Sequence, residues 1–149
     1  MKLTKMDREL IYTKLMDKLT QLANFNLASR KLRLWSDVPP AEFPCLFLSE
    51  VDEIAVQEST KPVKWYFRPE IYIYVNSSSL NGDDTPYSQL NRIIDAIGNE
   101  LQVTLTPSQA VTLDETVNYV KINGNIRKSG GVLGDIAVAI IPLEIMIVV

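Results

Sequence analysis

Residues 63–75 alternate strictly between two kinds of side chain, and no other feature constrains the fold as much. Because successive side chains of a β-strand point to opposite faces of a sheet, this period of two predicts a long strand with one apolar and one amphipathic face. Pro69 lacks the backbone donor for a ladder hydrogen bond, so we expect a bulge or an edge position there. The apolar face holds Val63, Trp65, Phe67, Pro69, Ile71, Ile73 and Val75, and the other holds Lys64, Tyr66, Arg68, Glu70, Tyr72 and Tyr74.

Two segments have the period of an amphipathic helix instead. Residues 7–23 follow a sequence typical of a helix N-terminus and place one apolar stripe opposite a polar face. A second helix is predicted from Thr85, as N-cap, and Pro86, in the favoured first position. The first stripe holds Ile11, Tyr12, Leu15, Met16, Leu19, Leu22 and Ala23, and the second holds Tyr87, Leu90, Ile93, Ile94, Ile97 and Leu101.

The remaining segments predict shorter strands and two loops. Strands are expected at residues 30–34, 45–49 and 117–126, with Gly124 as a bulge or a site of close approach. Residues 136–149 are apolar on both parities, which indicates a strand covered on both faces. Residues 35–44 contain three prolines and predict an ordered loop. Residues 127–134, rich in glycine, predict a mobile loop before the last strand.

Together these elements predict one α+β domain over residues 1–149. An antiparallel-rich mixed sheet would carry both helices on one face, with a long glycine-loop hairpin near the C-terminus. The chain has 149 residues and 46% apolar residues, so it has material for one core without disulfides or metals. Two helices cover only one sheet face, so part of the other face needs a different cover, and a sister subunit is the natural candidate.

The residue inventory argues against enzymatic chemistry. The chain contains no histidine and one cysteine, Cys45, which excludes histidine-based nucleophile systems, histidine-containing metal sites and a disulfide framework. We therefore expect no catalytic residues, no metal and no cofactor. The N-terminal residues contain no apolar run typical of a signal peptide, and the apolar C-terminal segment is too short to cross a bilayer, so we expect a cytoplasmic chain without a membrane partner.

Three groups of residues are candidates for interaction. Tyr66, Tyr72 and Tyr74 lie on the amphipathic face of the long strand, and tyrosines are enriched at subunit interfaces. Basic residues precede the proline loop and, given a net charge of −3, offer only a local site for DNA. The glycine-rich segment carries the third group, suited to docking on a partner. The basic group is Arg30, Lys31 and Arg33, and the glycine-rich group is Arg127, Lys128, Ser129, Gly130 and Gly131.

Two motifs resemble the tail terminator proteins of long-tailed bacteriophages. The first is the sequence of residues 35–42, WSDVPPAE, followed by Pro44 and residues 46–48, LFL. The second is GVLGD at residues 131–135, leading into AVAIIP at residues 137–142. The order of elements, with a leading helix, a proline loop, a strand containing Lys64–Trp65 and a helix in mid-chain, resembles that family over most of the chain. Residues 129–131 depart from it by being more flexible and less acidic.

The resemblance implies a structural protein of the virion. Such proteins form a homo-oligomeric ring, usually a hexamer, at the head-proximal end of the tail, after assembly in the host cytoplasm. The ring stops polymerisation of the tail tube protein and presents a surface to head completion or neck proteins. DNA passes through its channel without sequence-specific binding. The family has no catalytic residues.

Two alternatives remain open from the sequence. The first is another neck or tube subunit of the same assembly, which sequence patterns do not separate from a terminator. From a different class, it would be a small ligand-binding or hydrolytic α+β domain that uses carboxylates such as Glu70 and Asp95. That hypothesis requires the two carboxylates to converge.

Overall fold

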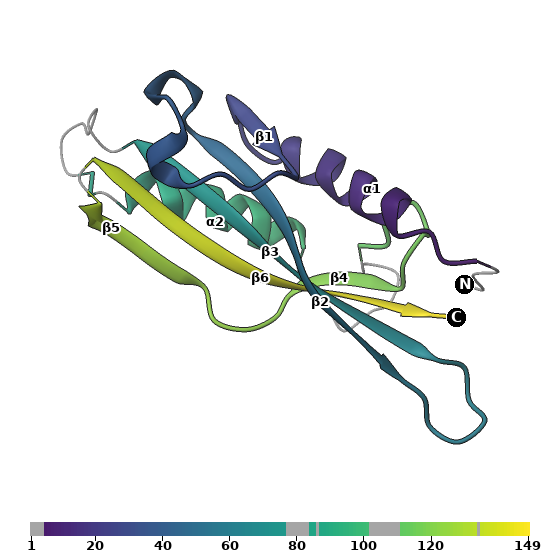
Figure 1. The fold of residues 1–149 in the computed structure, drawn as a ribbon. Coiled ribbons are helices and arrows are strands. Elements are labelled where there is room, and N and C mark those ends of the chain that lie inside the picture. The colour runs from purple at the N-terminus through teal and green to yellow at the C-terminus, as the bar shows by residue number, and fades with distance from the viewer. Residues whose placement is uncertain (1–4, 77–83, 86, 102–110, 134) are drawn as a thin grey trace.

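A six-stranded, mostly antiparallel sheet and two helices form the fold in this computed structural model (Figure 1). The structure describes residues 5–76, 84–85, 87–101, 111–133 and 135–149. Along the sheet the strands follow the order β1, β2, β3, β6, β4, and β5 pairs with β6 as well. The elements are α1 (Arg8–Thr20), β1 (Leu27–Ser29), β2 (Cys45–Val56), β3 (Lys64–Asn76), α2 (Ser88–Glu100), β4 (Tyr119–Ile122), β5 (Arg127–Leu133) and β6 (Ile136–Val148).

The long strand predicted from alternation is confirmed as β3, at the centre of the sheet. It pairs antiparallel with β2 on one side and β6 on the other. Pro69 therefore does not lie at an edge. The β3–β6 pairing is interrupted between Phe67 and Glu70, and on the other side the β2 register shifts between Ser49 and Asp52. The irregularity at Pro69 thus extends across three strands. We call this part of the sheet, around residues 67–70 of β3, the waist.

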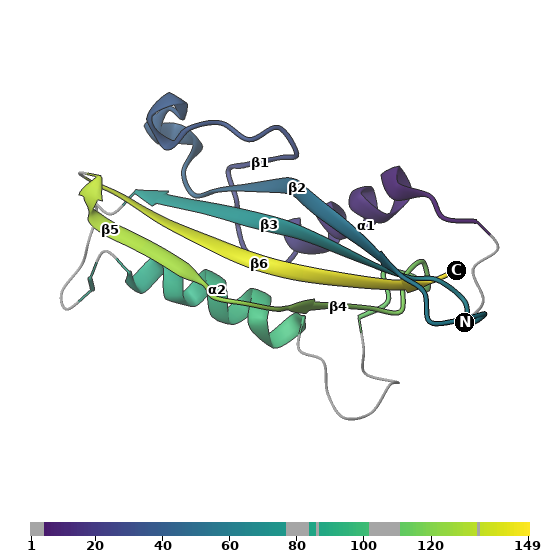
Figure 2. The same ribbon diagram turned by 60° about the horizontal axis from the view of Figure 1, so that its bottom comes forward.

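The main core lies on one face of the sheet, which we call the inner face. Odd-numbered residues of β3 and β6 point into it, and both helices contribute buried side chains to the same cluster. Figure 2 shows α2 lying along the sheet beside β5 and β6. The Tyr12 ring of α1 stacks on Phe67 with 5.9 Å between centroids. The helical contribution is Ile11, Tyr12, Leu15 and Leu19 from α1, and Leu90, Ile93 and Ile97 from α2.

Local capping explains where the helices begin. Asp7 precedes α1 and accepts a hydrogen bond from the Leu10 amide at 3.1 Å, as an N-cap side chain does. The second helix begins at Ser88 rather than at Thr85, although the Thr85 hydroxyl accepts a hydrogen bond from the Tyr87 amide. Pro86 lies outside the described residues. Among the residues that the structure describes, no helix combines the length and apolar character needed to span a membrane.

The predicted proline loop is confirmed and covers one end of the opposite, outer face. It contains two short 3₁₀ turns, η1 (Trp35–Asp37) and η2 (Pro40–Glu42). Beneath it lies a second buried cluster formed by Val38, Phe43, Cys45, Phe47 and Tyr74. The Cys45 thiol is fully buried there, and burial raises its pKa to about 12, which suits a core side chain and not a nucleophile.

The strands around the proline loop differ from the prediction. Residues 30–34 are not a strand; β1 lies just before them and pairs in parallel with β2. The chain crosses the outer face after β1, where the Arg33 carbonyl accepts a hydrogen bond from the Tyr74 hydroxyl at 2.8 Å. The second strand, in turn, continues through the acidic stretch as far as Val56. Tertiary hydrogen bonds therefore override the short alternating pattern.

The prediction of a mobile loop over residues 127–134 is wrong for residues 127–133, which form β5. This strand pairs antiparallel with β6, in register Arg127 to Ile140 and Leu133 to Ile136. This pairing satisfies backbone donors and acceptors along β6, and the glycines of β5 have no side chains that would obstruct it. Gly124, by contrast, is confirmed as a site of close approach: its φ is +122°, and an added Cβ would lie 3.1 Å from Pro142 Cγ.

Candidate interaction surfaces

The three tyrosines of β3 share the outer face but lie in different surroundings. Tyr74 is only 4% exposed and belongs to the cluster beneath the proline loop. Burial there raises the pKa of Tyr74 to about 12. Tyr72 is half-buried against the same cluster. Tyr66 lies beyond the waist, half-buried and outside both clusters. Of the predicted interface residues, Tyr66 and Tyr72 therefore remain accessible on the surface, and Tyr74 does not.

The part of the sheet beyond the waist, which we call the arm, has an uncovered outer face. It comprises residues 51–70 of the β2–β3 hairpin, whose connected end extends past the end of β6 (Figure 1). Ile54 and Val56 are exposed, and Ile54 lies opposite Tyr66 across the two strands. Val51, at the register shift, is 54% exposed. The arm thus presents apolar side chains on a sheet face that no described segment of the chain covers.

The basic residues before the proline loop do not form one stripe. Arg30 forms ion pairs with Glu9 and Glu50 at 2.9 and 2.8 Å, and its guanidinium lies over the Tyr12 ring of the inner core. The Arg30 guanidinium holds the pKa of the Glu9 carboxyl below its usual range.

Arg33 lies on the other side of the sheet. It pairs with Glu42 at 2.8 Å and lies over the Phe47 ring of the outer cluster. Lys31, between them, is exposed. Of the predicted DNA-facing group, the two arginines are therefore neutralised on opposite faces, and only Lys31 presents an uncompensated charge.

The predicted tube-contact residues of β5 lie along an edge of the sheet. The Arg127 guanidinium donates to Glu70 at 2.8 Å on the outer face, and the Lys128 ammonium donates to Asn91 of α2 at 2.8 Å on the inner side. Ser129 pairs with Val138, and Gly130 and Gly131 continue the strand. These residues are thus held in a strand rather than displayed on a loop tip.

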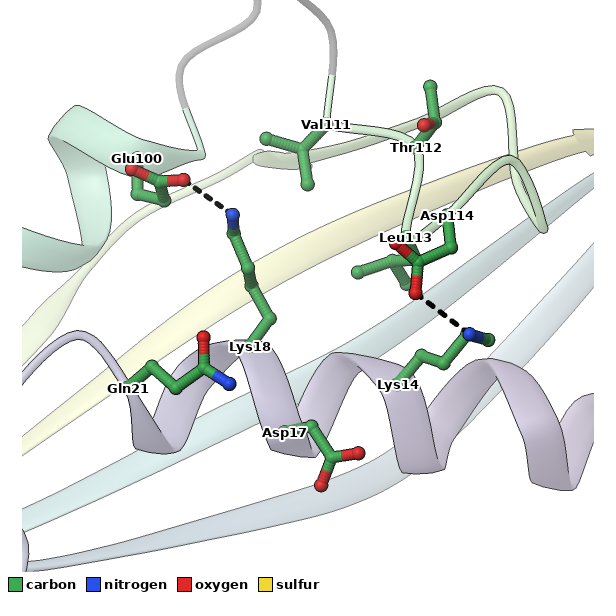
Figure 3. Close-up of a pocket in the computed structure, with 9 residues that line it drawn as sticks. All are labelled: Lys14, Asp17, Lys18, Gln21, Glu100, Val111, Thr112, Leu113 and Asp114. Carbon is green, nitrogen blue, oxygen red and sulfur yellow. Dashed lines mark hydrogen bonds and ion pairs between the residues drawn. The ribbon is translucent and has the colours of Figure 1, made fainter.

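A cavity of about 640 Å³ opens between α1, the end of α2 and residues 111–114 (Figure 3). Its two lysines are both engaged: Lys14 pairs with Asp114 at 2.8 Å, and Lys18 pairs with Glu100. The Lys14 ammonium lowers the pKa of the exposed Asp114 carboxyl. The lining also carries Asp17, so two lysines face three carboxylates and four of these five charges pair with one another. The lining therefore offers no strongly charged site for an ionic ligand.

The two carboxylates of the hydrolytic hypothesis do not converge. Glu70 lies on the outer face, paired with Arg127, whereas Asp95 is exposed on α2, which packs on the inner face. Within the described part of the chain, no three His, Cys, Asp or Glu side chains gather as a metal site would require. Glu70 and Asp95 therefore do not form one site, as that hypothesis requires.

One polar cluster was not predicted from the sequence. Glu144 of β6 is only 8% exposed, on the outer face of the sheet. It accepts hydrogen bonds from the Tyr119 hydroxyl at 2.8 Å and from the Asn123 amide at 3.3 Å, with the Lys121 ammonium 3.7 Å away. Burial, together with the hydrogen bond to Glu144, raises the pKa of Tyr119. A lone Glu in an apolar strand was the available signal, because a buried carboxylate requires such partners.

Comparisons with known proteins leave the family open. No protein-family model matches the chain, and no curated protein matches it. Among solved structures, one chain of 13% identity covers 97% of this chain and 97% of its own length, with a TM-score of 0.49. That similarity is too low to indicate a shared fold or function.

Proposed function

We propose that this chain is a structural subunit of a homo-oligomeric ring of the tail-terminator kind. The ring would cap the head-proximal end of a phage tail tube, stop its polymerisation, offer a joining surface to head completion or neck proteins, and leave a channel for DNA. The sequence motifs of the proline loop and of the C-terminal hairpin motivate this proposal. The structural observation that supports it best is the uncovered outer face of the arm.

This face is unusual for a chain that acts alone. Both helices contribute to the inner core, and the proposal is that they leave the outer face to other subunits. The proline loop covers that face only at one end. At the other end, half-buried Tyr66 and Met146 lie opposite each other, beside exposed Ile54. Aromatic and aliphatic side chains in this arrangement are typical of the centre of a subunit contact.

DNA passage does not require a basic lumen in this proposal. The chain has a net charge of −3, and Arg30 and Arg33 are neutralised by carboxylates. A wide channel with few uncompensated cations lets DNA slide without binding it, because non-specific affinity grows with the number of phosphates that cations neutralise. Lys31 remains the single candidate of that group for a contact with DNA.

The decisive measurement is the mass of the protein in solution, by light scattering, alone and with a purified tail tube. We expect a ring in at least one condition, and Tyr66→Glu should shift it toward monomer because a charge would be buried at the contact. Thr13→Glu, on the exposed face of α1, is the matched control and should leave the mass unchanged. A wild-type chain that stays monomeric in both conditions would rule the proposal out.

The alternative role as a tube or neck subunit differs in its effect on tail length. A terminator added to growing tubes stops their elongation at substoichiometric amounts, whereas a tube subunit is incorporated along the whole length. Electron microscopy of tubes assembled with and without the protein separates the two. Labelled protein found at one end only supports the terminator, and labelling along the tube supports the alternative.

A further inference from the structure

The sheet has an unpaired edge on each side, and the two edges are distinct. On one side, β1 pairs with β2 only as far as Phe47, so the edge of β2 from Leu48 to Val56 pairs with no described strand. On the other side, β5 pairs with β6 but has no described strand beyond it. An unpaired edge is a row of backbone donors and acceptors that can template another strand.

The directions of the strands make these two edges compatible. The path from β2 through β3 and β6 to β5 is antiparallel at every step. After these four strands, a β2 strand of a second copy in the same orientation would again run antiparallel to β5. The pairing therefore continues the ladder in its antiparallel form, which is slightly more stable per residue than the parallel form.

The charges on the two edges are opposite. The unpaired part of β2 carries Glu50, Asp52 and Glu53 without a basic residue, and β5 carries Arg127 and Lys128 without an acidic one. Like charges directly opposite each other destabilise strand pairs, and opposite charges stabilise them. Pairing of β2 with β2, or of β5 with β5, is thus disfavoured, and pairing of β2 with β5 is favoured.

The charges also match face by face. Asp52 and Arg127 both lie on the outer face, since Asp52 is opposite Arg68, and Arg127 reaches Glu70. Glu53 and Lys128 lie on the inner side, where they contact Arg8 of α1 and Asn91 of α2. Asp52 has no ionic partner among the described residues, and Lys128 contacts a neutral amide, so both retain charge for a neighbour.

We propose that the edge of β2 beyond Phe47 pairs with the β5 edge of a second copy of this chain, head to tail. This inference rests on the proposed ring and names the contact that would close it. Because the two surfaces differ, the contact is heterologous and repeats until the ring closes. The unpaired part of β2 lies toward the arm, and β5 lies toward the proline loop, so neighbouring copies are staggered along the strands, as closed rings of tilted strands require.

Reversing the charge of one edge at a time tests the pairing. Glu50 and Glu53 already pair with Arg30 and Arg8, so Asp52→Lys with Ala55→Lys leaves only uncompensated lysines on the β2 edge and makes both edges basic. Arg127→Glu with Lys128→Glu makes both edges acidic. Each variant alone should associate at least tenfold more weakly than the wild type at low salt. A one-to-one mixture of the two should recover assembly to within about threefold, because every contact then joins an acidic edge to a basic one. A chain carrying all four changes should recover it as well.

The changed positions are exposed, so each variant should keep the wild-type unfolding midpoint, which serves as the folding control. A covalent readout does not depend on ring stability: Asp52→Cys with Arg127→Cys should yield a ladder of oxidised oligomers, while Asp52→Cys alone should yield no species above a dimer. Rings of unchanged mass in all the charge variants, together with no ladder, would overturn the edge pairing and leave the ring proposal intact. A wild-type monomer under every condition would overturn both.

Discussion

At one end of the outer face, the proline loop covers Phe47 and Tyr74, whereas at the other end no described segment covers Ile54, Val56 and Tyr66. Both ends belong to the same two strands, β2 and β3, and both alternate with a period of two. The difference comes from the loop, which crosses the sheet on one side of the waist only. Alternation thus predicts which side chains share a face, but not whether the chain itself covers that face.

The largest loss of stability is expected at Phe47. Its side chain is fully buried in the outer cluster, so Phe47→Ala should lower the free energy of unfolding by about 3–5 kcal/mol through lost burial and a cavity. Ile54→Ala, on the same strand in the arm, should cost less than about 1 kcal/mol. Urea unfolding measures both. Equal costs would mean that the arm is covered within the monomer.

A smaller effect is expected at the waist that separates the two ends. Gly124 has a φ of +122°, and an added Cβ would lie against Pro142, so Gly124→Ala should cost about 1–3 kcal/mol. Gly98→Ala is the matched control, because it lies in a helix with ordinary space around its Cβ and should be neutral or slightly stabilising. Thermal unfolding would contradict this account if Gly98→Ala were the more damaging of the two.

The hydroxyl of Tyr74 is expected to contribute less to the free energy of unfolding than Gly124 does. Tyr74→Phe removes its hydrogen bond to the Arg33 carbonyl and should cost about 1 kcal/mol, whereas Tyr72→Phe, whose hydroxyl has no such partner among the described residues, should be nearly neutral.

The stability at alkaline pH gives a second test of the role of Tyr74. Burial raises the pKa of Tyr74 to about 12 from its usual value near 10, so the fold favours the neutral phenol. The stability that depends on it is complete below pH 10 and is lost as the pH rises from 10 through 12. Tyr74→Phe should therefore lose less stability than the wild type over that interval, and parallel curves for the two proteins would contradict the assignment.

The sequence predicted the elements whose patterns are long. The alternation of residues 63–75 became β3, the apolar stripe after Asp7 became α1, and the two-sided apolar C-terminus became β6. These patterns succeed because a long periodic segment can bury its apolar side chains in one conformation only. The proline loop was equally clear, because proline excludes both helix interiors and central strands.

The predictions that were wrong concern short segments whose conformation depends on contacts with other parts of the chain. Residues 30–34 alternate like a strand, yet the Tyr74 hydroxyl and the Glu42 carboxylate hold Arg33 over the outer cluster instead. The segment containing Gly130 and Gly131 has weak local preference, and β6 supplies the hydrogen bonds that make it a strand. The burial of Tyr74 could not be predicted for the same reason, since it depends on a loop far from it in sequence.

The smallest expected effect concerns the ion pair between Arg127 and Glu70, which lies close to the waist. The Arg127 side chain is mostly exposed, so water and salt screen the pair, and Arg127→Gln should change the free energy of unfolding by less than about 1 kcal/mol. The same substitution removes a charge from the β5 edge, so it should weaken self-association more than it weakens folding, and added salt should reduce both effects. Measuring unfolding and association at low and high salt separates the two roles. A large, salt-independent loss of folding stability would show that Arg127 acts as a packing residue of the monomer, and would remove it from the contact between copies.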